Sequence, residues 1–585
     1  MTIIDFLKER ATKNADELAF RFMGNGELDG PITEWTFSEL YRQSAGVAED
    51  LVEQGLTGSS VLLVFPPGLD FVKAFYGCLL AGARAVPVPL PNPRSKNPLG
   101  RILNTAGACG ASTVLTNQEL AEMVAPMMSE LPVSLKAVTD RVATNWAGPW
   151  PEMNEVAYLQ FTSGSTGHPK GVAVKHTNAV SNVRVMGEML RLDSTKPAMV
   201  WAPHYHDLCL VGFVLGPVQF GYESTLMGPM EFLLKPVRWL RAMSHYKIAN
   251  TACPNFGYEY SARRIKPEEC EGLDLSHWIV AGNGGEPVLQ QTLEMFNKKF
   301  GPYGFRPQTF MPCYGMAESV LFVAGLKSLS QAPKVLTLSA TDLETHTVRV
   351  LPDNEPGGRN VISCGRPGSD HRVIAVDPAT LTRSNPNQVG ELWVQGPSVP
   401  GAYWGLPEES TATFEGRLAD TNEGPFLRTG DLGFVADGEV YLTGRLKDLI
   451  IIAGRNHYPS DIELTVQQSG APVRLGACVA ISERVNGAEE LVIIAEVDEK
   501  RLPADAQSKG TGTESMDEFW ASAVKTVQGA ISMGHGLSVR SVVFVEPRSL
   551  EKTSSGKPRR QHYQELYLKG ALAVRHEKRM MQQKR

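Results

Sequence analysis

The sequence has little of what marks several common protein classes. Its 585 residues include only 8 cysteines, none in a C-x-x-C pair, so neither a zinc site of that type nor a disulfide framework is indicated. The most apolar window, 208–220, is interrupted by glycine and proline and is too short to span a bilayer. Lysine and arginine are not in excess, since 57 of them stand against 63 acidic residues. These absences argue against a nucleic-acid-binding protein and against an integral membrane segment.

The start of the chain also lacks the features of a secretory signal peptide, because acidic and basic side chains interrupt its apolar stretch. Hydrophobic residues make up 42% of the sequence and charged residues 21%, which is typical of a soluble globular protein. A chain of this length predicts several domains. We therefore expect a multi-domain cytoplasmic protein.

Strand and helix patterns alternate through the first half of the chain. A buried-strand run at 60–65 is followed by a helical stretch at 71–81 and a β-branched run at 85–90. This order predicts a βαβ unit in a parallel sheet. The pattern returns with a strand at 277–281 and a helix at 287–300, which is expected to carry its proline in the first turn. The chain up to about residue 330 is therefore predicted to form doubly wound α/β layers.

From about 332 to 442 the runs are short, β-rich and punctuated by turns, which predicts a small β-barrel or sheet subdomain. A separate unit follows Gly444. Within it, Asn486-Gly487 is a strong hairpin-turn signal. Its expected elements are strands at 478–481, 491–497 and 542–545 and an amphipathic helix at 516–531.

The most informative stretch is Phe161-Thr-Ser-Gly-Ser-Thr-Gly-His-Pro-Lys-Gly171, at the end of an apolar strand. Its six consecutive small residues let the backbone fold closely around an anion and present N–H groups and hydroxyls to phosphate oxygens. Lys170 adds a positive charge. The stretch does not match the P-loop pattern, because His168 and Pro169 separate the last glycine from the lysine. A flexible Ser/Gly turn is the alternative, and a P-loop ATPase is disfavoured.

Four later motifs occur in a fixed order. They are Tyr314-Gly-Met-Ala-Glu318, Arg428-Thr-Gly-Asp-Leu432, Gly444-Arg445 and Ser554-Ser-Gly-Lys557. With the phosphate loop, they resemble the signature motifs of the adenylate-forming enzymes, which include acyl-CoA synthetases, peptide-synthetase adenylation domains and luciferases. Ala317 stands where that family usually has threonine. The resemblance covers nearly the whole chain.

The resemblance implies an α/β fold in two unequal parts. A large N-terminal domain, residues 1–446, would hold two doubly wound α/β subdomains plus the small β subdomain. A small, mobile α+β C-terminal domain, residues 447–585, would carry the catalytic lysine.

The implied reaction is attack of a carboxylate on the α-phosphate of ATP, which releases pyrophosphate and leaves an acyl-adenylate. The tasks of the protein are then positioning and charge neutralisation. Glu318 offers a hard oxygen ligand for Mg²⁺, the expected metal. By resemblance, the nucleotide would be held by Thr162, Ser163, Gly164, Ser165, Thr166, Gly167, Lys170, Asn283, Gly284, Gly285, Glu286, Tyr314, Gly315, Met316, Ala317, Asp431 and Arg445.

Further residues take roles in catalysis or domain motion by the same resemblance. Lys557 would swing in to neutralise the transition state, and Arg445 would lie near the ribose and α-phosphate. Lys447 matches the hinge of the domain rotation, with a plain surface lysine as the alternative. His206 matches the gate between phosphate and acyl pocket. His204 competes for that role, but His206 is favoured because an aspartate follows it directly.

Several segments resemble fatty acyl-AMP ligases more than acyl-CoA synthetases. The segment 328–360 looks like the extra segment of that branch, which is thought to hinder the domain motion that CoA ligases need. Ile451 stands where CoA ligases carry a lysine. Phe256 and Tyr258 are candidates for the acyl pocket, whose size stays open. The other segments of this kind are His206-Asp207, Pro254-Asn-Phe-Gly-Tyr258, 361–367 and 450–459.

The expected function is activation of a medium- or long-chain fatty acid as its adenylate, with ATP and Mg²⁺. The acyl group would then pass to the phosphopantetheine thiol of a separate acyl carrier protein, or of a carrier domain in a polyketide or peptide synthase. The alternative is a fatty acyl-CoA ligase that uses free CoA. A catalytically silent member of the fold is disfavoured, because Lys557, Glu318, Asp431 and Arg445 are all present.

Overall fold

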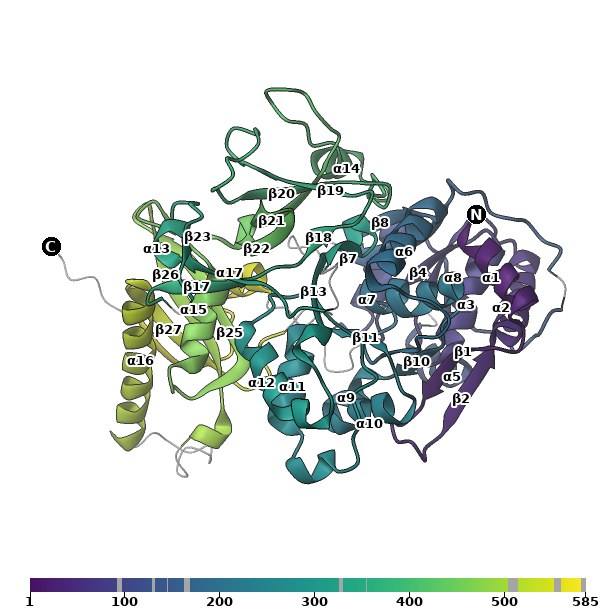
Figure 1. Ribbon diagram of the computed structural model, residues 1–585, viewed down its shortest axis with the longest axis horizontal. Coiled ribbons are helices and arrows are strands. Elements are labelled where there is room, and N and C mark those ends of the chain that lie inside the picture. Colours follow the sequence, from purple (N-terminus) through teal and green to yellow (C-terminus); the bar gives the residue numbers. More distant parts are fainter. Residues whose placement is uncertain are drawn as a thin grey trace.

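The computed structural model places the N-terminal region at one end of an elongated molecule and the C-terminal region at the other, as Figure 1 shows. The residues that it describes are 1–91, 97–128, 132–144, 146–162, 169–325, 330–353, 355–502, 514–551 and 559–579.

A six-stranded sheet in the order β6-β5-β3-β4-β7-β8 forms the first subdomain. Its strands are β3 (Ser60–Leu63), β4 (Arg84–Pro87), β5 (Thr113–Thr116), β6 (Ser134–Ala137), β7 (Val156–Thr162) and β8 (Lys170–Lys175). The first five strands in this order, β6, β5, β3, β4 and β7, pair in parallel with their neighbours, and β8 is antiparallel to β7. The predicted βαβ unit is confirmed as β3, α3 (Leu69–Leu80) and β4. Nearly every residue of α3 is buried, which explains its apolar sequence.

A nine-stranded sheet follows, in the order β18-β14-β13-β12-β11-β9-β10-β1-β2. It is parallel from β13 to β1 and antiparallel at both edges. The N-terminal strand β1 lies beside β10, far along the chain. The strands are β1 (Leu18–Met23), β2 (Ile32–Thr36), β9 (Ala198–Val200), β10 (Ser224–Met227), β11 (Asn250–Cys253), β12 (Val280–Asn283), β13 (Phe310–Gly315), β14 (Phe322–Gly325) and β18 (Arg366–Pro367).

One large apolar core joins these two sheets and the helices around them. The doubly wound α/β arrangement expected for this half is therefore confirmed. The longer helices of the two subdomains are α1 (Ile3–Lys13), α2 (Phe37–Glu53), α4 (Gly100–Cys109), α5 (Gln118–Met128), α6 (His176–Leu190), α10 (Val237–His245), α11 (Asn255–Arg264) and α12 (Gln290–Phe300).

Two small sheets make up the β-rich part, which confirms the sheet alternative rather than a closed barrel. The first has the order β16-β15-β17 and the second the order β19-β20-β21-β22. The second lies at the top of Figure 1, next to α14 (Pro407–Phe414). The strands are β15 (Val335–Ser339), β16 (Val350–Leu351), β17 (Gly358–Ile362), β19 (Arg372–Val376), β20 (Gly390–Gln395), β21 (Leu427–Ala436) and β22 (Glu439–Arg445).

The smaller C-terminal domain is a four-stranded sheet with helices on both faces. Alternate residues of its strands enter two separate cores, because side chains along a strand point to opposite faces. One core includes α15 (Pro459–Gln468) and α16 (Glu514–His535), and the other includes α17 (Arg560–Leu568). The predicted hairpin is confirmed, since Asn486 and Gly487 both have positive φ. The strands are β25 (Val473–Val485), β26 (Ala488–Val497), β27 (Val539–Val545) and β28 (Val574–Arg579), with β23 (Ile450–Ile452) and β24 (Arg455–His457) forming a small ribbon.

Two predicted boundaries are wrong. The strand expected at 277–281 begins three residues later, at Val280, where parallel pairing with β11 starts. The helix expected from Pro287 begins at Gln290, so the proline lies outside its first turn. The side chain of Asn255 accepts the Leu289 N–H at 3.1 Å, which holds that residue extended and delays the helix.

Polar contacts between the two domains form what we call the seam, the set of pairs Glu344–Arg455, Arg359–Asp461 and Gln291–Gln468. The two ion pairs have N–O distances of 3.1 and 3.0 Å, and the two amides lie 3.0 Å apart. The Arg455 side chain is 62% exposed. Glu344 and Arg359 belong to the segment singled out as a branch-specific insertion, so this segment contacts the C-terminal domain directly.

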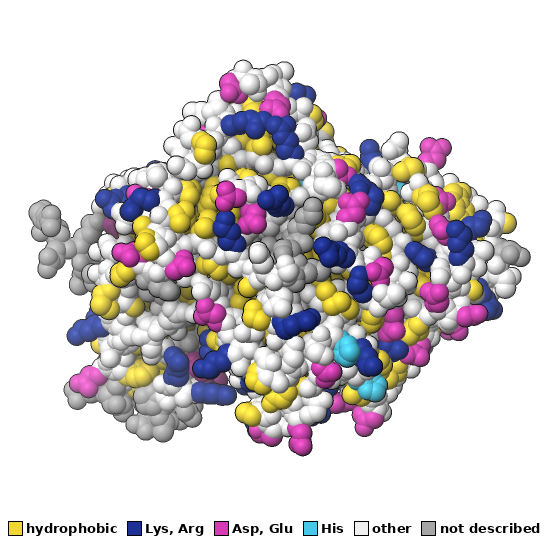
Figure 2. Space-filling view, in the orientation of Figure 1, with side chains coloured by type: hydrophobic (Ala, Val, Ile, Leu, Met, Phe, Trp, Pro, Cys, Tyr) yellow, Lys and Arg dark blue, Asp and Glu magenta, His cyan; other side chains and the backbone are white. Residues whose placement is uncertain are grey.

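The surface mixes charges of both signs, as the net charge of −6 predicts. On the face in Figure 2, lysine and arginine alternate with aspartate and glutamate. Among the described residues, no helix combines the length and hydropathy needed to cross a bilayer.

Candidate active site

Three motif residues meet where β13 approaches the β21–β22 hairpin. The Tyr314 hydroxyl donates to Asp431 Oδ2 at 3.0 Å, and Arg445 Nε donates to Asp431 Oδ1 at 2.7 Å. Asp431 and Arg445 are also cross-strand partners. Burial raises the pKa of Tyr314 well above its ordinary value, so its hydroxyl stays protonated and remains a donor. The structure therefore brings together three residues that the sequence placed in separate motifs.

A buried glutamate holds the turn that carries Asp431. Gly430 adopts a φ of +70°, a conformation that favours glycine, and its N–H donates to Glu391 Oε1 at 3.0 Å. Glu391 is 2% exposed and also accepts from Arg428 and from the Trp393 indole. Sequence reasoning missed Glu391, because it acts across two strands and belongs to no motif.

Glu318 lies on the 3₁₀ turn η5 (Ala317–Ser319), directly after β13. The Tyr403 hydroxyl donates to its Oε1 at 2.9 Å. Burial raises the pKa of the Glu318 carboxyl. The ammonium of Lys170 lies 5.2 Å from the centre of the Tyr403 ring. Tyr403 thus contacts both Glu318 and Lys170. Sequence reasoning missed this residue, although the aromatic pair Tyr403-Trp404 between Gly401 and Gly405 could have drawn attention to it.

The chain after Glu318 turns sharply. Val320 has φ 68° and ψ −62°, and the Leu321 N–H donates to the Ser319 carbonyl at 2.9 Å, which defines a strained γ-turn. The buried amide of Asn182 holds this turn through hydrogen bonds of 2.8–3.1 Å to Ser319 and Phe322. A strained backbone of this kind persists only where its surroundings enforce it, so Asn182 helps to fix the segment that follows Glu318.

Glu318 fits a magnesium ion held jointly with a nucleotide. Mg²⁺ prefers oxygen ligands and is usually bound by one or two carboxylates together with substrate phosphates. In the described part of the chain, no three His, Cys, Asp or Glu side chains form a preassembled metal cage. A single buried carboxylate matches that mode of binding better than a closed structural metal site.

The segment from Asn283 to Glu286 lies at the end of β12. A side chain at Gly284 would come within 2.8 Å of the Cys313 carbonyl, so the two backbones approach closely there. The Oδ1 atom of Asn283 is buried without a hydrogen-bond partner among the described residues. Glu286 Oε1 accepts the Phe256 N–H at 2.5 Å, at the start of α11. Asn283 and Gly284, two of the residues predicted to hold the nucleotide, therefore lie beside the strand that carries Tyr314.

Gly315, Met316 and Ala317 connect Tyr314 to Glu318. A side chain at position 315 would lie 1.8 Å from the Leu321 carbonyl oxygen, so only glycine fits. The Met316 N–H donates to that same carbonyl at 2.8 Å.

The two candidate gate histidines differ in their surroundings. His204 is buried, with its ring centre 4.1 Å from that of Phe71, and burial lowers its pKa to about 3. His206 Nδ1 lies 2.6 Å from Asp207 Oδ1 and its side chain is 19% exposed. His206 is the more exposed of the two, and its role as the gate stays a prediction.

The two acyl-pocket candidates also differ. Tyr258 is fully buried among aromatic rings and donates its hydroxyl to the Gly282 carbonyl at 2.8 Å. Phe256 is partly exposed, and its ring lies 5.7 Å from that of Trp201. Tyr258 is thus part of the core in this conformation, and the acyl-pocket role of both residues stays a prediction.

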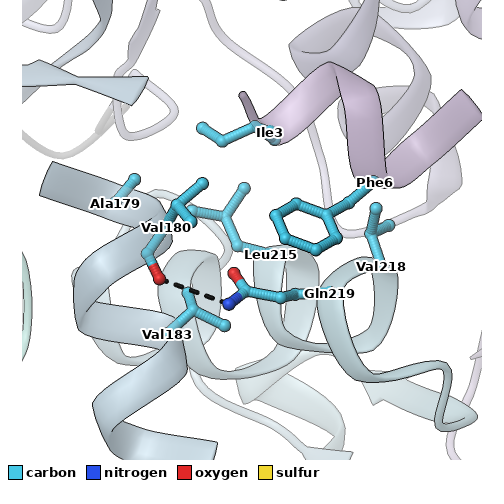
Figure 3. Close-up of a pocket in the computed structure, with 8 residues that line it drawn as sticks. All are labelled: Ile3, Phe6, Ala179, Val180, Val183, Leu215, Val218 and Gln219. Carbon is cyan, nitrogen blue, oxygen red and sulfur yellow. Dashed lines mark hydrogen bonds between the residues drawn. The ribbon is translucent and has the colours of Figure 1, made fainter. Parts of the chain in front are cut away.

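A separate apolar hollow lies between α1, α6 and α8 (Gly216–Phe220), as Figure 3 shows. Its lining includes no titratable side chain and no predicted site residue. The hollow therefore gives no basis for assigning chemistry there.

Lys447 is exposed in the 3₁₀ turn η6 (Leu446–Asp448), between Arg445 and the C-terminal domain. Its neighbour Asp448 accepts a hydrogen bond from Arg560 at 2.8 Å. The phosphate-loop residues Ser163, Gly164, Ser165, Thr166 and Gly167, and the lysine Lys557, lie outside the described residues; Thr162 ends β7.

Two family models together match most of the chain. Residues 7–404 match the family described as AMP-binding enzyme, and residues 447–577 match the one described as Disco-interacting protein 2-like, AMP domain. The chain is 38% identical to the medium-chain-fatty-acid–[acyl-carrier-protein] ligase JamA of Moorena producens, over 98% of this chain and 96% of that protein. It is 33% identical to the long-chain-fatty-acid–AMP ligase FadD32 of Mycolicibacterium smegmatis, over 98% and 95% of the two chains.

A solved structure agrees with these relatives. The crystal structure of a fatty acid AMP ligase from Legionella pneumophila matches with a TM-score of 0.75 and 33% identity, over 99% of this chain and 98% of that one. The family match spans well over half of the chain, and the geometry brings Tyr314, Asp431 and Arg445 of three of that family's motifs together. The chain therefore belongs to the AMP-binding, adenylate-forming enzymes and, within them, to the fatty acyl-AMP ligases.

Proposed function

We propose that the protein activates a medium- or long-chain fatty acid with ATP and then transfers the acyl group to a carrier-bound thiol. In the first step a carboxylate oxygen bonds to the α-phosphorus of ATP, the bond to the β-phosphate oxygen breaks, and pyrophosphate leaves. In the second step a phosphopantetheine thiol loses its proton, its sulfur attacks the acyl carbonyl, and AMP leaves. A cytoplasmic location fits a reaction that consumes ATP.

The observation that carries this proposal is the joining of Tyr314, Asp431 and Arg445 by two hydrogen bonds. Asp431 would accept hydrogen bonds from the ribose hydroxyls, as a carboxylate does well. Arg445 would bind near the α-phosphate, where its half-exposed guanidinium can still turn toward an anion. Tyr314 would pack beside the adenine, together with the segment Asn283–Glu286.

The remaining roles concern the triphosphate. We assign the phosphates to the loop 162–167 and to Lys170, and the neutralising charge in the transition state to Lys557. Glu318 would hold Mg²⁺, which supplies positive charge to the phosphate oxygens when bound. His206 would separate the phosphates from the fatty acid, with Phe256 and Tyr258 on the acyl side. Lys447 would act as the hinge of a domain rotation between residues 446 and 447.

A carrier protein is the proposed acceptor in place of free CoA. JamA is named as a ligase for an acyl carrier protein. The segment 328–360 forms one side of the seam, so it would restrain the rotation that brings CoA into the site. Ile451 is 48% exposed where CoA ligases carry a lysine. The proposed partner is a separate acyl carrier protein or a carrier domain of a polyketide or peptide synthase.

The proposal is tested by mass spectrometry of the products formed from ATP, MgCl₂ and dodecanoic acid. The reaction is run alone, with CoA, and with a carrier protein bearing phosphopantetheine, and Lys557→Ala serves as the inactive control. We expect acyl-AMP that persists when CoA is added and disappears as acyl-carrier forms. Rapid conversion to acyl-CoA would instead identify a fatty acyl-CoA ligase.

A further inference from the structure

A single tyrosine lies between the two charged groups that would handle the triphosphate. The hydroxyl of Tyr403 donates to Glu318 Oε1 at 2.9 Å, and the Lys170 ammonium lies 5.2 Å from its ring centre. Lys170 follows the phosphate loop, whereas Glu318 follows β13. These two residues come from different sheets, and Tyr403 contacts both.

The backbone around Tyr403 is fastened to the strand that begins with Lys170. The Trp404 N–H donates to the Gly171 carbonyl at 2.7 Å, and the Ala173 N–H donates to the Ala402 carbonyl at 3.0 Å. Residues 402–404 thereby extend the six-stranded sheet past β8, with Tyr403 opposite Val172. The position of the tyrosine relative to Lys170 is therefore set by the sheet.

The side chain of Tyr403 is held as firmly as its backbone. Its ring is 7% exposed and packs against Phe414 with the ring centres 5.1 Å apart. The Ser410 hydroxyl accepts the backbone N–H of Tyr403 at 2.9 Å. An immobilised phenol of this kind loses little rotamer freedom on making a hydrogen bond, so its direction can determine that of the partner.

We propose that Tyr403 is a positioning residue that aims the Glu318 carboxylate at the metal position and fixes it relative to Lys170. Its bond to Oε1 leaves Oε2 to face a cation, and the bond prevents the carboxylate from rotating away. The inference rests on the proposed function, since Glu318 is taken as the ligand of a nucleotide-bound metal. The aromatic face adds an attraction for the Lys170 ammonium.

The two contacts predict different effects for two substitutions. Tyr403→Phe removes the hydroxyl but keeps the ring beside Lys170, whereas Tyr403→Leu removes both. We expect the phenylalanine variant to bind the metal about threefold to tenfold more weakly in the nucleotide complex, the size of one ordinary hydrogen bond. Its KM for ATP at saturating MgCl₂ should stay within about twofold of that of the wild type. The leucine variant should raise the KM for ATP as well, by about twofold to fivefold.

The decisive measurement is a Mn²⁺ titration of the full-length protein with a non-hydrolysable ATP analogue, followed by electron paramagnetic resonance. This readout does not depend on turnover, so it separates the two proposals. A wild type that forms no acyl-AMP would refute the proposed function. A Tyr403→Phe variant that binds Mn²⁺ as tightly as the wild type would overturn the role of Tyr403, whether or not the enzyme turns over.

Tyr441→Phe is the matched control. Tyr441 is also fully buried and donates its hydroxyl to a glutamate, Glu439, at 3.2 Å, but it lies in a different core cluster. A general effect of losing a buried tyrosine hydroxyl would appear in both variants. We expect weaker Mn²⁺ binding only in Tyr403→Phe, and equal weakening in both would show that the effect is structural.

Discussion

The nucleotide end of the site and the seam both rely on polar contacts between distant parts of the chain, but they place these contacts in different surroundings. Asp431 is 7% exposed and is bound through both carboxylate oxygens. At the seam, Arg455 pairs with Glu344 while 62% of its side chain faces solvent. The two ion pairs are alike in exposure, since Arg445 is 51% exposed and Arg455 is 62% exposed. The difference lies in the second bond to Asp431, from the Tyr314 hydroxyl, which is buried from water.

From this difference we expect the contacts among Tyr314, Asp431 and Arg445 to hold their geometry, and the contacts of the seam to separate more easily. Removing one partner of a buried polar pair leaves the other unsatisfied, which costs far more than the net value of the bond. Removing one partner of a solvated pair costs little, because water replaces it. Four substitutions test this division, from the largest expected effect to the smallest.

Asp431→Asn should have the largest effect, because it disturbs both hydrogen bonds that Asp431 accepts. The amide presents a donor where Tyr314 and Arg445 both donate, so one contact becomes repulsive. We expect acyl-AMP formation to fall at least about 100-fold while the fold survives. The measurement is pyrophosphate release. The control is Asp437→Asn in the same β21–β22 hairpin, where the Asp437 side chain is 80% exposed; a similar loss in both variants would contradict the assignment.

Arg560→Met tests whether the C-terminal domain is internally as firm as the nucleotide end. Arg560 donates to both oxygens of Glu463 at 2.7 Å and to Asp448 at 2.8 Å. Its loss leaves the buried Glu463 and the half-buried Asp448 without their cation, and we expect destabilisation by about 3–5 kcal/mol. Denaturant unfolding of the full chain provides the value. Arg559→Met is the neighbouring control, because its partner Glu551 is 66% exposed; equal losses would show that burial does not set the cost.

His204→Phe tests how burial of a titratable side chain makes the free energy of unfolding depend on pH. Burial lowers the pKa of His204 in the folded protein to about 3, whereas an unfolded histidine has a pKa of about 6.5. As the pH falls below about 6.5 the unfolded chain takes up this proton first, so stability is lost toward pH 3 at up to about 1.4 kcal/mol per pH unit. Between about pH 6.5 and 5 the wild type should lose about 2 kcal/mol more than the variant.

The measurement for His204 is denaturant unfolding followed by tryptophan fluorescence across this pH range. His277→Asn is the control, because 43% of the His277 side chain is exposed. Parallel pH curves for wild type and His204→Phe would contradict the prediction.

Glu344→Gln should have the smallest effect on stability. It removes an ion pair whose arginine is 62% exposed, and we expect a loss of less than about 1 kcal/mol. If the seam restrains domain rotation, acyl-CoA should become detectable when CoA is supplied. Arg349→Gln is the control, since Arg349 is also exposed but pairs within its own sheet region, with Asp342. A large loss of stability, or acyl-CoA from the control variant as well, would show that the seam is not the weak contact described here.

The motif residues were predictable because each occupies a fixed place beside a strand or turn signal. Tyr314, Asp431 and Arg445 could be identified because their motifs resemble, in order, those of the adenylate-forming enzymes. The βαβ unit around α3 could be predicted from hydrophobic runs. The contacts between them could not, since the Tyr314–Asp431 bond joins residues 117 positions apart. Their pairing depends on how β13 meets the β21–β22 hairpin, and no local pattern encodes that packing.

Residues that support the site through others escaped prediction for the same reason. Tyr403 reaches Glu318 across 85 positions, and Asn182 reaches Phe322 across 140. The late start of α12 has a similar cause, because the Asn255 side chain captures the Leu289 N–H from another element. Tertiary hydrogen bonds thus overrode local propensity at the places where sequence reasoning failed.

The pairing of β1 with β10 has a consequence for how the protein is made. Phe20 is aligned with Ser224, so the first strand completes its sheet only after some 200 further residues have left the ribosome. At synthesis rates of about 5–20 residues per second, that interval is about 10–40 s. The strands of the six-stranded sheet, which end at Lys175, emerge well before then. Until then β1 can pair with β2 along one edge, but its other edge stays open. An open strand edge of this kind is what chaperones shield during translation.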